Sequence, residues 1–188
     1  MGNTVMSVNV RDEIIDEIIS GNPDRVNPAI EKARDRDHGE RARLFEECFD
    51  KLKELYRGEE DGYKRQSIVR FLRAIYHPLI EGGLEEDCDE KLREFYLDCL
   101  EDDDGRVRLA AVKGLKRLLG DKVISGDKSH LLPCLSRLEE MKEKFQGKKK
   151  KHVEKAIEHV DWFSLPQKWR MMETFHRIIE KKRGKKEE

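Results

Sequence analysis

Cysteine is scarce in this chain of 188 residues, and the four cysteines, at positions 48, 88, 99 and 134, show no CxxC spacing. That pattern fits neither a disulfide framework nor a zinc site built on paired thiolates. Cys48 and Cys99 fall on apolar helix faces, where a thiol behaves as a small hydrophobic group. Free thiols are typical of reducing compartments, so we expect a cytoplasmic protein.

Long apolar runs are also missing. No stretch of the sequence approaches the ~18 residues that a membrane-spanning helix needs, and the N-terminus lacks the apolar core of a signal peptide. The strict alternation of apolar and polar residues that marks half-buried strands is nowhere sustained. We therefore expect no membrane partner and an all-α fold.

Recognisable catalytic patterns are absent as well. The six histidines include no HExxH pair, and His152 and His159, seven residues apart, have no evident third metal ligand. There is no glycine-rich phosphate loop, and no base can be inferred for the serines or cysteines. Although catalytic groups can assemble from distant positions, the sequence gives no reason to expect an enzyme, a metal or a cofactor.

Charge is what the chain has in abundance. Charged residues make up 42% and apolar residues 37%, a balance that suits an elongated stack of helices, each with one solvated face. Residues 1–104 carry 16 Lys+Arg and 28 Asp+Glu, whereas residues 105–188 carry 23 and 12. This asymmetry predicts a charge dipole along the long axis and an anionic partner at the C-terminal end. Head-to-tail self-association and plain solubility are the alternatives.

Helical periodicity runs through nearly the whole chain, and the five prolines lie at or near expected helix ends. The pattern predicts helices over 10–20, 25–37, 40–57, 62–77, 88–101, 105–120, 129–145, 149–161 and 164–183. Taken in pairs, they make four hairpins and a closing helix. We expect a single domain over 1–183 and a disordered charged tail at 184–188.

Segment 61–73 resembles segment 104–116, which lies 43 residues further along. Both segments start with Asp-Gly, both have an arginine at the fifth position (the arginine slot), and they share further basic positions. A period of this length is typical of stacked helix pairs. Arg65 and Arg108 occupy the arginine slot close to the apolar side, where an unpaired charge is costly, so we interpret both as structural. Gly114, inside the second segment, predicts a close approach of two helices.

The acidic start, the Val-Arg pair and the Ala-Ala-Val-x-Gly-Leu run within 104–119 resemble the second helix of a HEAT repeat. The resemblance is fair over 40–77, where Lys64 stands in place of Val107, and a third copy around 152–153 lacks the arginine. It implies a right-handed α-solenoid of about four HEAT-like helical hairpins with a C-terminal capping helix. The second helices of such a solenoid line a concave surface that binds protein or nucleic acid.

A row of cations follows the solvent side of the second helices. Arg70 and Arg73 align with Lys113 and Lys116 of the next copy, and these cations suit an acidic peptide or a phosphate backbone if the copies stack regularly. Outward-facing charge for solvation alone is the alternative. The lysine run at 148–151 opposes the dipole of the helix it begins, so local stability does not explain it. The predicted partner-binding residues are Arg70, Arg73, Lys113, Lys116, Arg117, Lys148, Lys149, Lys150, Lys151 and Lys155.

The sequence thus predicts an intracellular binding or scaffold module whose basic inner helix face engages an acidic segment of a protein partner. A nucleic-acid-binding protein with the same fold is the main alternative. A HEAT-like DNA glycosylase is a further one, suggested only by Asp161-Trp162. The aromatic residues over 162–175 have helical spacing that favours a cap on the core over a stacking platform for bases. No pattern specifies an oligomeric state.

Overall fold

The computed structural model describes residues 8–76, 88–124, 126, 128–166 and 170, and within them it contains helices and turns but no strand. The helices are α1 (Val8–Ile18), α2 (Pro23–Arg34), α3 (His38–Gly58), α4 (Gly62–Ile75), α5 (Cys88–Cys99), α6 (Gly105–Ile124), α7 (Leu131–Lys144) and α8 (Gly147–Ser164). The all-α prediction is confirmed. The closing helix expected over 164–183 lies almost wholly outside the described residues, as does the tail at 184–188.

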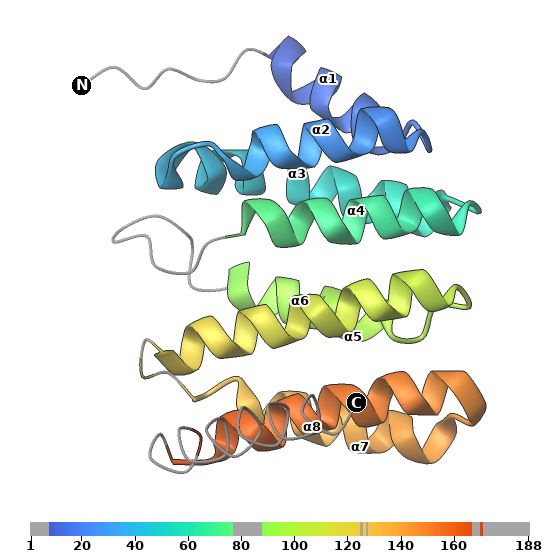
Figure 1. The fold of residues 1–188 in the computed structure, drawn as a ribbon, viewed down its shortest axis with the longest axis vertical. Coiled ribbons are helices and arrows are strands. Elements are labelled where there is room, and N and C mark those ends of the chain that lie inside the picture. Colours follow the sequence, from blue (N-terminus) through green and yellow to red (C-terminus); the bar gives the residue numbers. More distant parts are fainter. Residues whose placement is uncertain (1–7, 77–87, 125, 127, 167–169, 171–188) are drawn as a thin grey trace, which may run out of the picture.

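The helices lie in two layers, as Figure 1 shows: α2, α4, α6 and α8 form one layer, and α1, α3, α5 and α7 form the other. Each odd-numbered helix packs on the even-numbered helix that follows it. Each even-numbered helix also packs on the next even-numbered one. The result is an elongated stack in which α2, α4, α6 and α8 follow one another along the long axis and present one continuous face.

Short polar side chains begin four of these helices. Asn22, Asp37, Asp61 and Asp104 each accept a hydrogen bond from a backbone amide of the first turn, over 2.7 to 2.9 Å. Such N-caps satisfy amide groups that have no partner inside the helix. The start of α8 differs, because Gln146 makes no side-chain cap bond. The caps explain why α2, α3, α4 and α6 begin where they do.

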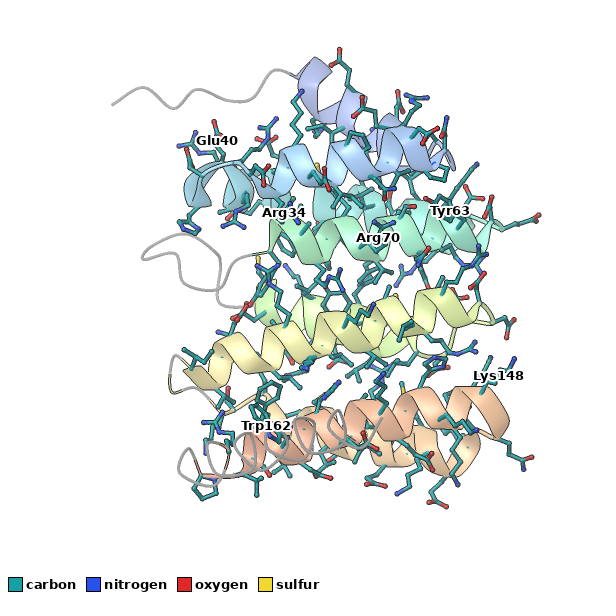
Figure 2. All side chains as sticks on the ribbon, in the orientation of Figure 1. Arg34, Glu40, Tyr63, Arg70, Lys148 and Trp162 are labelled. Carbon is teal, nitrogen blue, oxygen red and sulfur yellow. The ribbon has the colours of Figure 1, made fainter. Side chains whose placement is uncertain are left out.

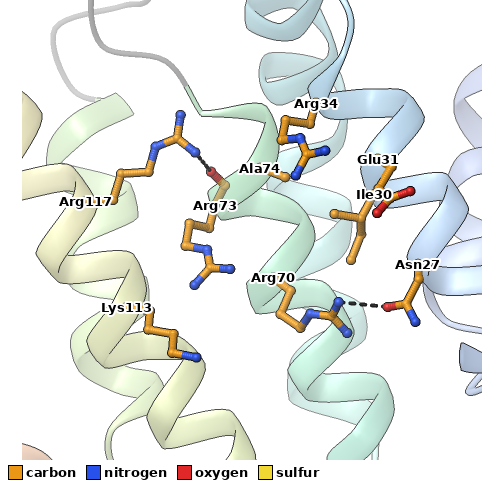
Figure 3. Close-up of a pocket in the computed structure, with 9 residues that line it drawn as sticks. All are labelled: Asn27, Ile30, Glu31, Arg34, Arg70, Arg73, Ala74, Lys113 and Arg117. Atoms are coloured by element: carbon orange, nitrogen blue, oxygen red, sulfur yellow. Dashed lines mark hydrogen bonds between the residues drawn. The ribbon is translucent and has the colours of Figure 1, made fainter. Parts of the chain in front are cut away.

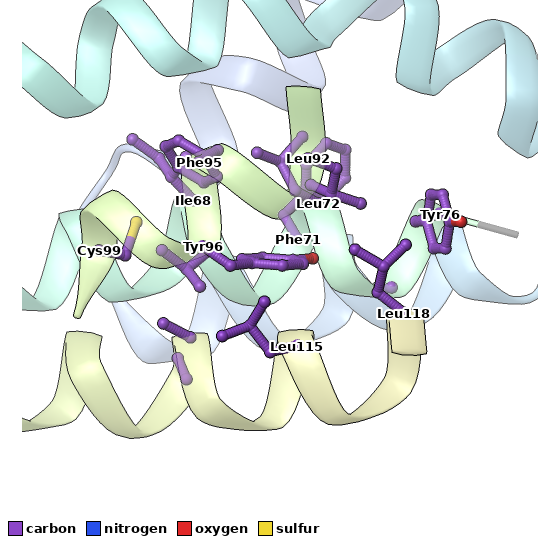
Figure 4. Close-up of a cluster of buried hydrophobic side chains, with 14 of the residues drawn as sticks. Ile68, Phe71, Leu72, Tyr76, Leu92, Phe95, Tyr96, Cys99, Leu115 and Leu118 are labelled. Carbon is purple, nitrogen blue, oxygen red and sulfur yellow. The ribbon is translucent and has the colours of Figure 1, made fainter. Parts of the chain in front are cut away.

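One apolar core runs between the two layers and takes side chains from all eight helices. Near its middle, Tyr96 of α5 lies against α6, as Figure 4 shows. Its ring covers Gly114 so closely that a Cβ atom at that position would lie 2.6 Å from the Tyr96 Cζ atom. That distance is well inside normal contact between carbon atoms. The close approach predicted from Gly114 is confirmed.

Arg65 and Arg108 make equivalent hydrogen bonds to the loops that precede their helices, α4 and α6. The Nη1 group of Arg65 donates to the carbonyl oxygens of Glu59 and Glu60, both over 2.8 Å. The Nη1 group of Arg108 donates to the carbonyl oxygens of Asp102 and Asp103, over 2.6 and 2.8 Å. All three positions of the second set lie 43 residues after those of the first. The internal repeat therefore extends to specific hydrogen bonds.

The two arginines differ in what they reach in the next helix pair. Arg65 donates from Nε and Nη2 to the Asp102 carboxylate, over 2.8 and 2.9 Å. Burial alone would raise the pKa of Asp102, but hydrogen bonds from Arg65 and Tyr56 outweigh burial and hold that pKa below its usual value. Arg108 instead donates from Nε to Nδ1 of His152, over 3.2 Å. Burial lowers the pKa of His152, and the charge of Arg108 lowers it further.

The third copy of the repeat begins earlier than the sequence indicated. Buried residues of α8 lie 42 residues after buried residues of α6; the matching positions are 111 and 153, 114 and 156, 115 and 157, and 118 and 160. In this register Lys150 takes the slot of Arg108. The copy expected around 152–153 is therefore out of register by a few residues, because lysines stand where α6 has its Val-Arg pair.

Candidate binding site: a basic cleft between α2, α4 and α6

Cations collect on the even-numbered helices. Helix α4 carries four Lys+Arg and no acidic residue, and α6 carries six Lys+Arg and one acidic residue. In the other layer, α1 carries one Lys+Arg and four acidic residues, and α5 carries two and four. The charge asymmetry of the chain is therefore also an asymmetry between the two layers.

A cleft of about 640 Å³ lies between α2, α4 and α6 on the face of the even-numbered helices (Figure 3). We call it the basic cleft. Its volume falls within the ~300–1,000 Å³ that is common for ligand-binding sites. Its lining holds five cations, one carboxylate and three other side chains: Arg34, Arg70, Arg73, Lys113, Arg117, Glu31, Asn27, Ile30 and Ala74.

Four of the predicted partner-binding residues line this cleft. Arg70 and Arg73 come from α4, and Lys113 and Arg117 come from α6. Within each helix the two residues are three or four positions apart, which places their side chains on the same face. Figure 3 shows Arg73, Lys113 and Arg117 reaching into the space between the two helices, while Arg70 turns toward α2.

Two of the arginines are held by neighbouring groups. Nη2 of Arg70 donates to Oδ1 of Asn27 over 2.8 Å. Nη1 of Arg117 donates to the carbonyl oxygen of Arg73 over 3.1 Å, and its Nε lies 3.6 Å from the Asp121 carboxylate. Burial raises the pKa of that carboxylate above its usual value despite the charge of Arg117. These contacts orient both side chains and leave most of their donors free.

Arg73 has neither a hydrogen bond nor an ion pair from its side chain among the described residues, although it is partly buried. Burial lowers the pKa of its guanidinium group; the nearby Tyr96 hydroxyl acts in the opposite direction, and the charges of Arg117 and Arg70 lower the pKa further. A charge that is partly removed from water and has no protein partner is less favourable than a paired one. Arg73 is therefore the side chain of the cleft that gains most from an added anion.

Two more polar groups beside the basic cleft are buried without a partner: Nε of Arg41 and the hydroxyl of Tyr96. Arg41 is 7% exposed, and the charge of Arg117 is close enough to lower its pKa in addition to the effect of burial. Burial raises the pKa of Tyr96, whereas the charges of Arg73 and Arg117 lower it. The positive charge of the site thus extends behind its lining.

The other six predicted residues lie outside the lining of the cleft. Lys116 and Lys155 flank His159, whose pKa is lowered by burial and further by these two cations. Lys148, Lys150 and Lys151 lie within the first five residues of α8, and Figure 2 shows Lys148 well apart from Arg70.

Lys149 has a structural role that the sequence did not indicate. Its Nζ donates to the carbonyl oxygen of Glu101 over 2.9 Å and to the Asp103 carboxylate over 2.7 Å. It also lies 5.7 Å from the centre of the Phe145 ring. Part of the lysine run therefore ties α8 to the turn between α5 and α6.

Arg34, Arg41 and Tyr96 were missed by the sequence analysis. Arg34 could have been predicted from the sequence, because Asn27, Glu31 and Arg34 follow one another at helical spacing along α2 and therefore share a face. All three line the cleft. The burial of Arg41 and Tyr96 depends on packing between layers, for which the sequence carries no local signal.

No family model, curated protein or solved structure matches the chain. Within the described ranges, no three His, Cys, Asp or Glu side chains come together as metal ligands. The helices of that same part of the chain include none whose length and apolar character suffice to cross a membrane. The site is accordingly interpreted from its own geometry.

Proposed function

We propose that the protein is a binding module whose basic cleft engages an acidic segment of a protein partner. We further propose that the two-layered stack is a right-handed α-solenoid of HEAT-like helical pairs, with the even-numbered helices on its inner side. The repeated hydrogen bonds of Arg65 and Arg108 support this view of the fold. The four cysteines are buried and form no disulfide, which supports a cytoplasmic location.

The single observation that carries the functional proposal is the composition of the basic cleft, five cations against one carboxylate, with Arg73 unpaired among them. A guanidinium group binds a carboxylate through two parallel hydrogen bonds, and such charge-assisted bonds are stronger than neutral ones. An acidic side chain would give Arg73 the partner that it lacks.

Nucleic acid is the second candidate, and it is favoured by the cations that continue past the cleft, through Lys116 toward Lys155. Two features support a peptide over a polynucleotide. The lining of the cleft includes no aromatic side chain on which a base could stack. In addition, Glu154 and Glu158 interrupt the row of cations on α8.

Fluorescence anisotropy with labelled ligands tests the proposal. The ligands are a glutamate-rich peptide of about twelve residues and single- and double-stranded DNA oligonucleotides, each titrated at about 50 and 200 mM salt. We expect the peptide to bind with a shallow dependence on salt. Tighter binding of DNA with a steep salt dependence would place nucleic acid first.

Two double variants with equal loss of charge locate the binding surface. R70Q/K113Q removes two cations from the basic cleft, whereas K148Q/K151Q removes two exposed cations outside it. We expect the first to weaken peptide binding by about tenfold, which corresponds to ~1.4 kcal/mol, and the second by less than about twofold. Equal losses would show that the peptide responds to overall charge and does not occupy the cleft.

A further inference from the structure

We propose that the basic cleft recognises a phosphorylated side chain, a phosphoserine or phosphothreonine within the acidic segment, and that Arg73 is its principal ligand. This inference rests on the proposed function and adds a requirement to it. One residue of the partner must carry a phosphate group for tight binding.

The charge of the cleft is the first argument. Five cations and one carboxylate, that of Glu31, line the cleft. Arg34 and Arg117 also pair with Asp35 and Asp121 just outside the lining, so the positive excess is carried mainly by Arg70, Arg73 and Lys113. One aspartate or glutamate side chain neutralises a single unit of it. A phosphate monoester carries about −1.5 to −2 at pH 7, which suits a site with so many cations in a small volume.

The geometry of the donors is the second argument. A guanidinium group has five N–H donors, and none of those of Arg73 is used within the described part of the chain. Arg70 uses Nη2 for Asn27, and Arg117 uses Nη1 for the carbonyl oxygen of Arg73. The free donors of Arg73, Lys113 and Arg117 come from two helices and face the same space, whereas Arg70 turns toward α2. A tetrahedral phosphate has three acceptor oxygens to meet them, whereas a carboxylate has two.

The surroundings of Arg73 are the third argument. Its side chain is partly buried and lies near the Tyr96 hydroxyl, a buried polar group without a hydrogen-bond partner. In such a poorly solvated place a charge-assisted hydrogen bond is stronger than at an open surface. The same burial makes the empty site unfavourable, so part of the binding free energy comes from relieving an uncompensated charge.

A phosphodiester fits the site less well. Each phosphate of a nucleic acid carries one charge and two free oxygens, and its neighbouring sugars and bases would have to occupy a lining without aromatic residues. Recognition of a phosphorylated peptide by a group of arginines requires no stacking platform. The observations therefore favour the phosphorylated side chain.

Three labelled peptides with the same glutamate-rich sequence test the inference; only their central residue differs, serine in one, glutamate in the second and phosphoserine in the third. The protein is the full chain, and binding is measured by fluorescence anisotropy at physiological salt. We expect the phosphoserine peptide to bind at least about tenfold more tightly than the glutamate peptide. The serine peptide should be the weakest of the three.

R73K is the decisive variant because it keeps the charge and removes the planar, two-point geometry of the guanidinium group. We expect it to lose most of the preference for phosphoserine over glutamate while it retains weak binding of both peptides. The matched control is R57K, on an exposed residue at the end of α3, which should keep the full preference. Thermal unfolding of both variants shows whether they are folded.

The outcomes separate this inference from the proposed function. Equal affinity for the phosphoserine and glutamate peptides overturns the phosphate requirement and leaves an acidic-segment module in place. If none of the three peptides binds, both proposals fail. If a folded R73K protein keeps the full preference, the phosphate does not bind at Arg73 and the assignment to the basic cleft is wrong.

Discussion

Arg65 and Asp102 form a two-point ion pair that joins α4 to the turn before α6, with N–O distances of 2.8 and 2.9 Å. The Asp102 carboxylate is 5% exposed and also accepts hydrogen bonds from the Tyr56 hydroxyl and the backbone amide of Asp104. Four donors thus meet one buried carboxylate at the junction between two helix pairs. This junction should be sensitive to the loss of that charge.

Replacing Asp102 with asparagine should destabilise the protein strongly. Removal of one partner leaves the Arg65 guanidinium uncompensated, and breaking a buried ion pair costs ~3–5 kcal/mol in the free energy of unfolding. Urea unfolding followed by far-UV circular dichroism measures the change. D103N is the matched control, because the Asp103 side chain is 94% exposed and its ion pair with Lys149 is screened by solvent, so its loss should change stability little. Similar losses in the two variants would contradict the central role of Asp102.

Replacing Gly114 with alanine should also destabilise the protein, against the helix propensity of alanine. The new Cβ atom would lie 2.6 Å from Cζ of Tyr96, whose ring is fully buried and cannot easily move. Overpacking of this kind costs ~1–3 kcal/mol. G58A is the control: it has no atom within 4 Å of the added Cβ. It should leave stability unchanged or raise it by up to ~1 kcal/mol. A stable G114A protein would mean that α5 and α6 are not packed this closely.

The cysteine thiols should be unreactive in the folded protein. Burial raises the pKa of both Cys48 and Cys134 to about 12, so almost no thiolate is present at neutral pH. Because the thiolate is the reactive form, labelling by a disulfide reagent should require unfolding. Mass spectrometry of protein labelled with and without urea identifies the sites. Rapid labelling of Cys48 or Cys134 without urea would show that these helices open readily.

Stability should fall as the pH is lowered from about 7.5 to 5.5, with His152 as one cause. The pKa of His152 in the folded protein is lowered from the ordinary 6.5, first by burial and then by Arg108. Between that lowered value and ~6.5 the unfolded chain binds more protons than the folded one, so stability is lost as pH decreases through this window. The folded-state pKa of His159 is also lowered and has the same sign of effect.

The measurement for this prediction is the urea midpoint at several pH values for the wild-type protein and H152Q. Glutamine keeps an acceptor for Arg108 and does not titrate, so the variant should show a shallower loss of stability in acid. Part of the slope should remain because of His159. Identical slopes in the two proteins would show that His152 titrates as it does in the unfolded chain.

Helix positions could be predicted well from the sequence because the apolar periodicity is regular and caps such as Asp61 and Asp104 stand at the starts. The end of α6 could not. The prediction stopped at residue 120, since glycine commonly ends a helix, whereas α6 continues to Ile124. Gly120 is covered by Phe163: an added Cβ atom would lie 2.9 Å from Cζ of that ring. Gly120 is therefore explained by a contact between two helices and does not end α6.

Residues of the candidate site could be predicted from the sequence only where they lie within the internal repeat. Arg70 and Lys113 were found because copies 43 residues apart place them on equivalent faces, and both line the cleft. The same repeat pairs Arg73 with Lys116, which lies outside the lining, whereas Arg117, the neighbour of Lys116, lies inside it. The lysine run belongs to a different part of the surface, because α8 begins far from the cleft. The partnerless state of Arg73 depends on which side chains approach it from other helices, and no spacing rule expresses that.

Because Arg65 and Arg108 have different partners, the two junctions between helix pairs should weaken at different pH values. Protonation turns His152 from an acceptor into a cation that faces Arg108, so the junction to the last helix pair weakens at mildly acidic pH. The junction made by Asp102 remains intact until much lower pH, because its carboxylate resists protonation. Acid should therefore weaken the junction between α6 and α8 at a higher pH than the junction made by Asp102.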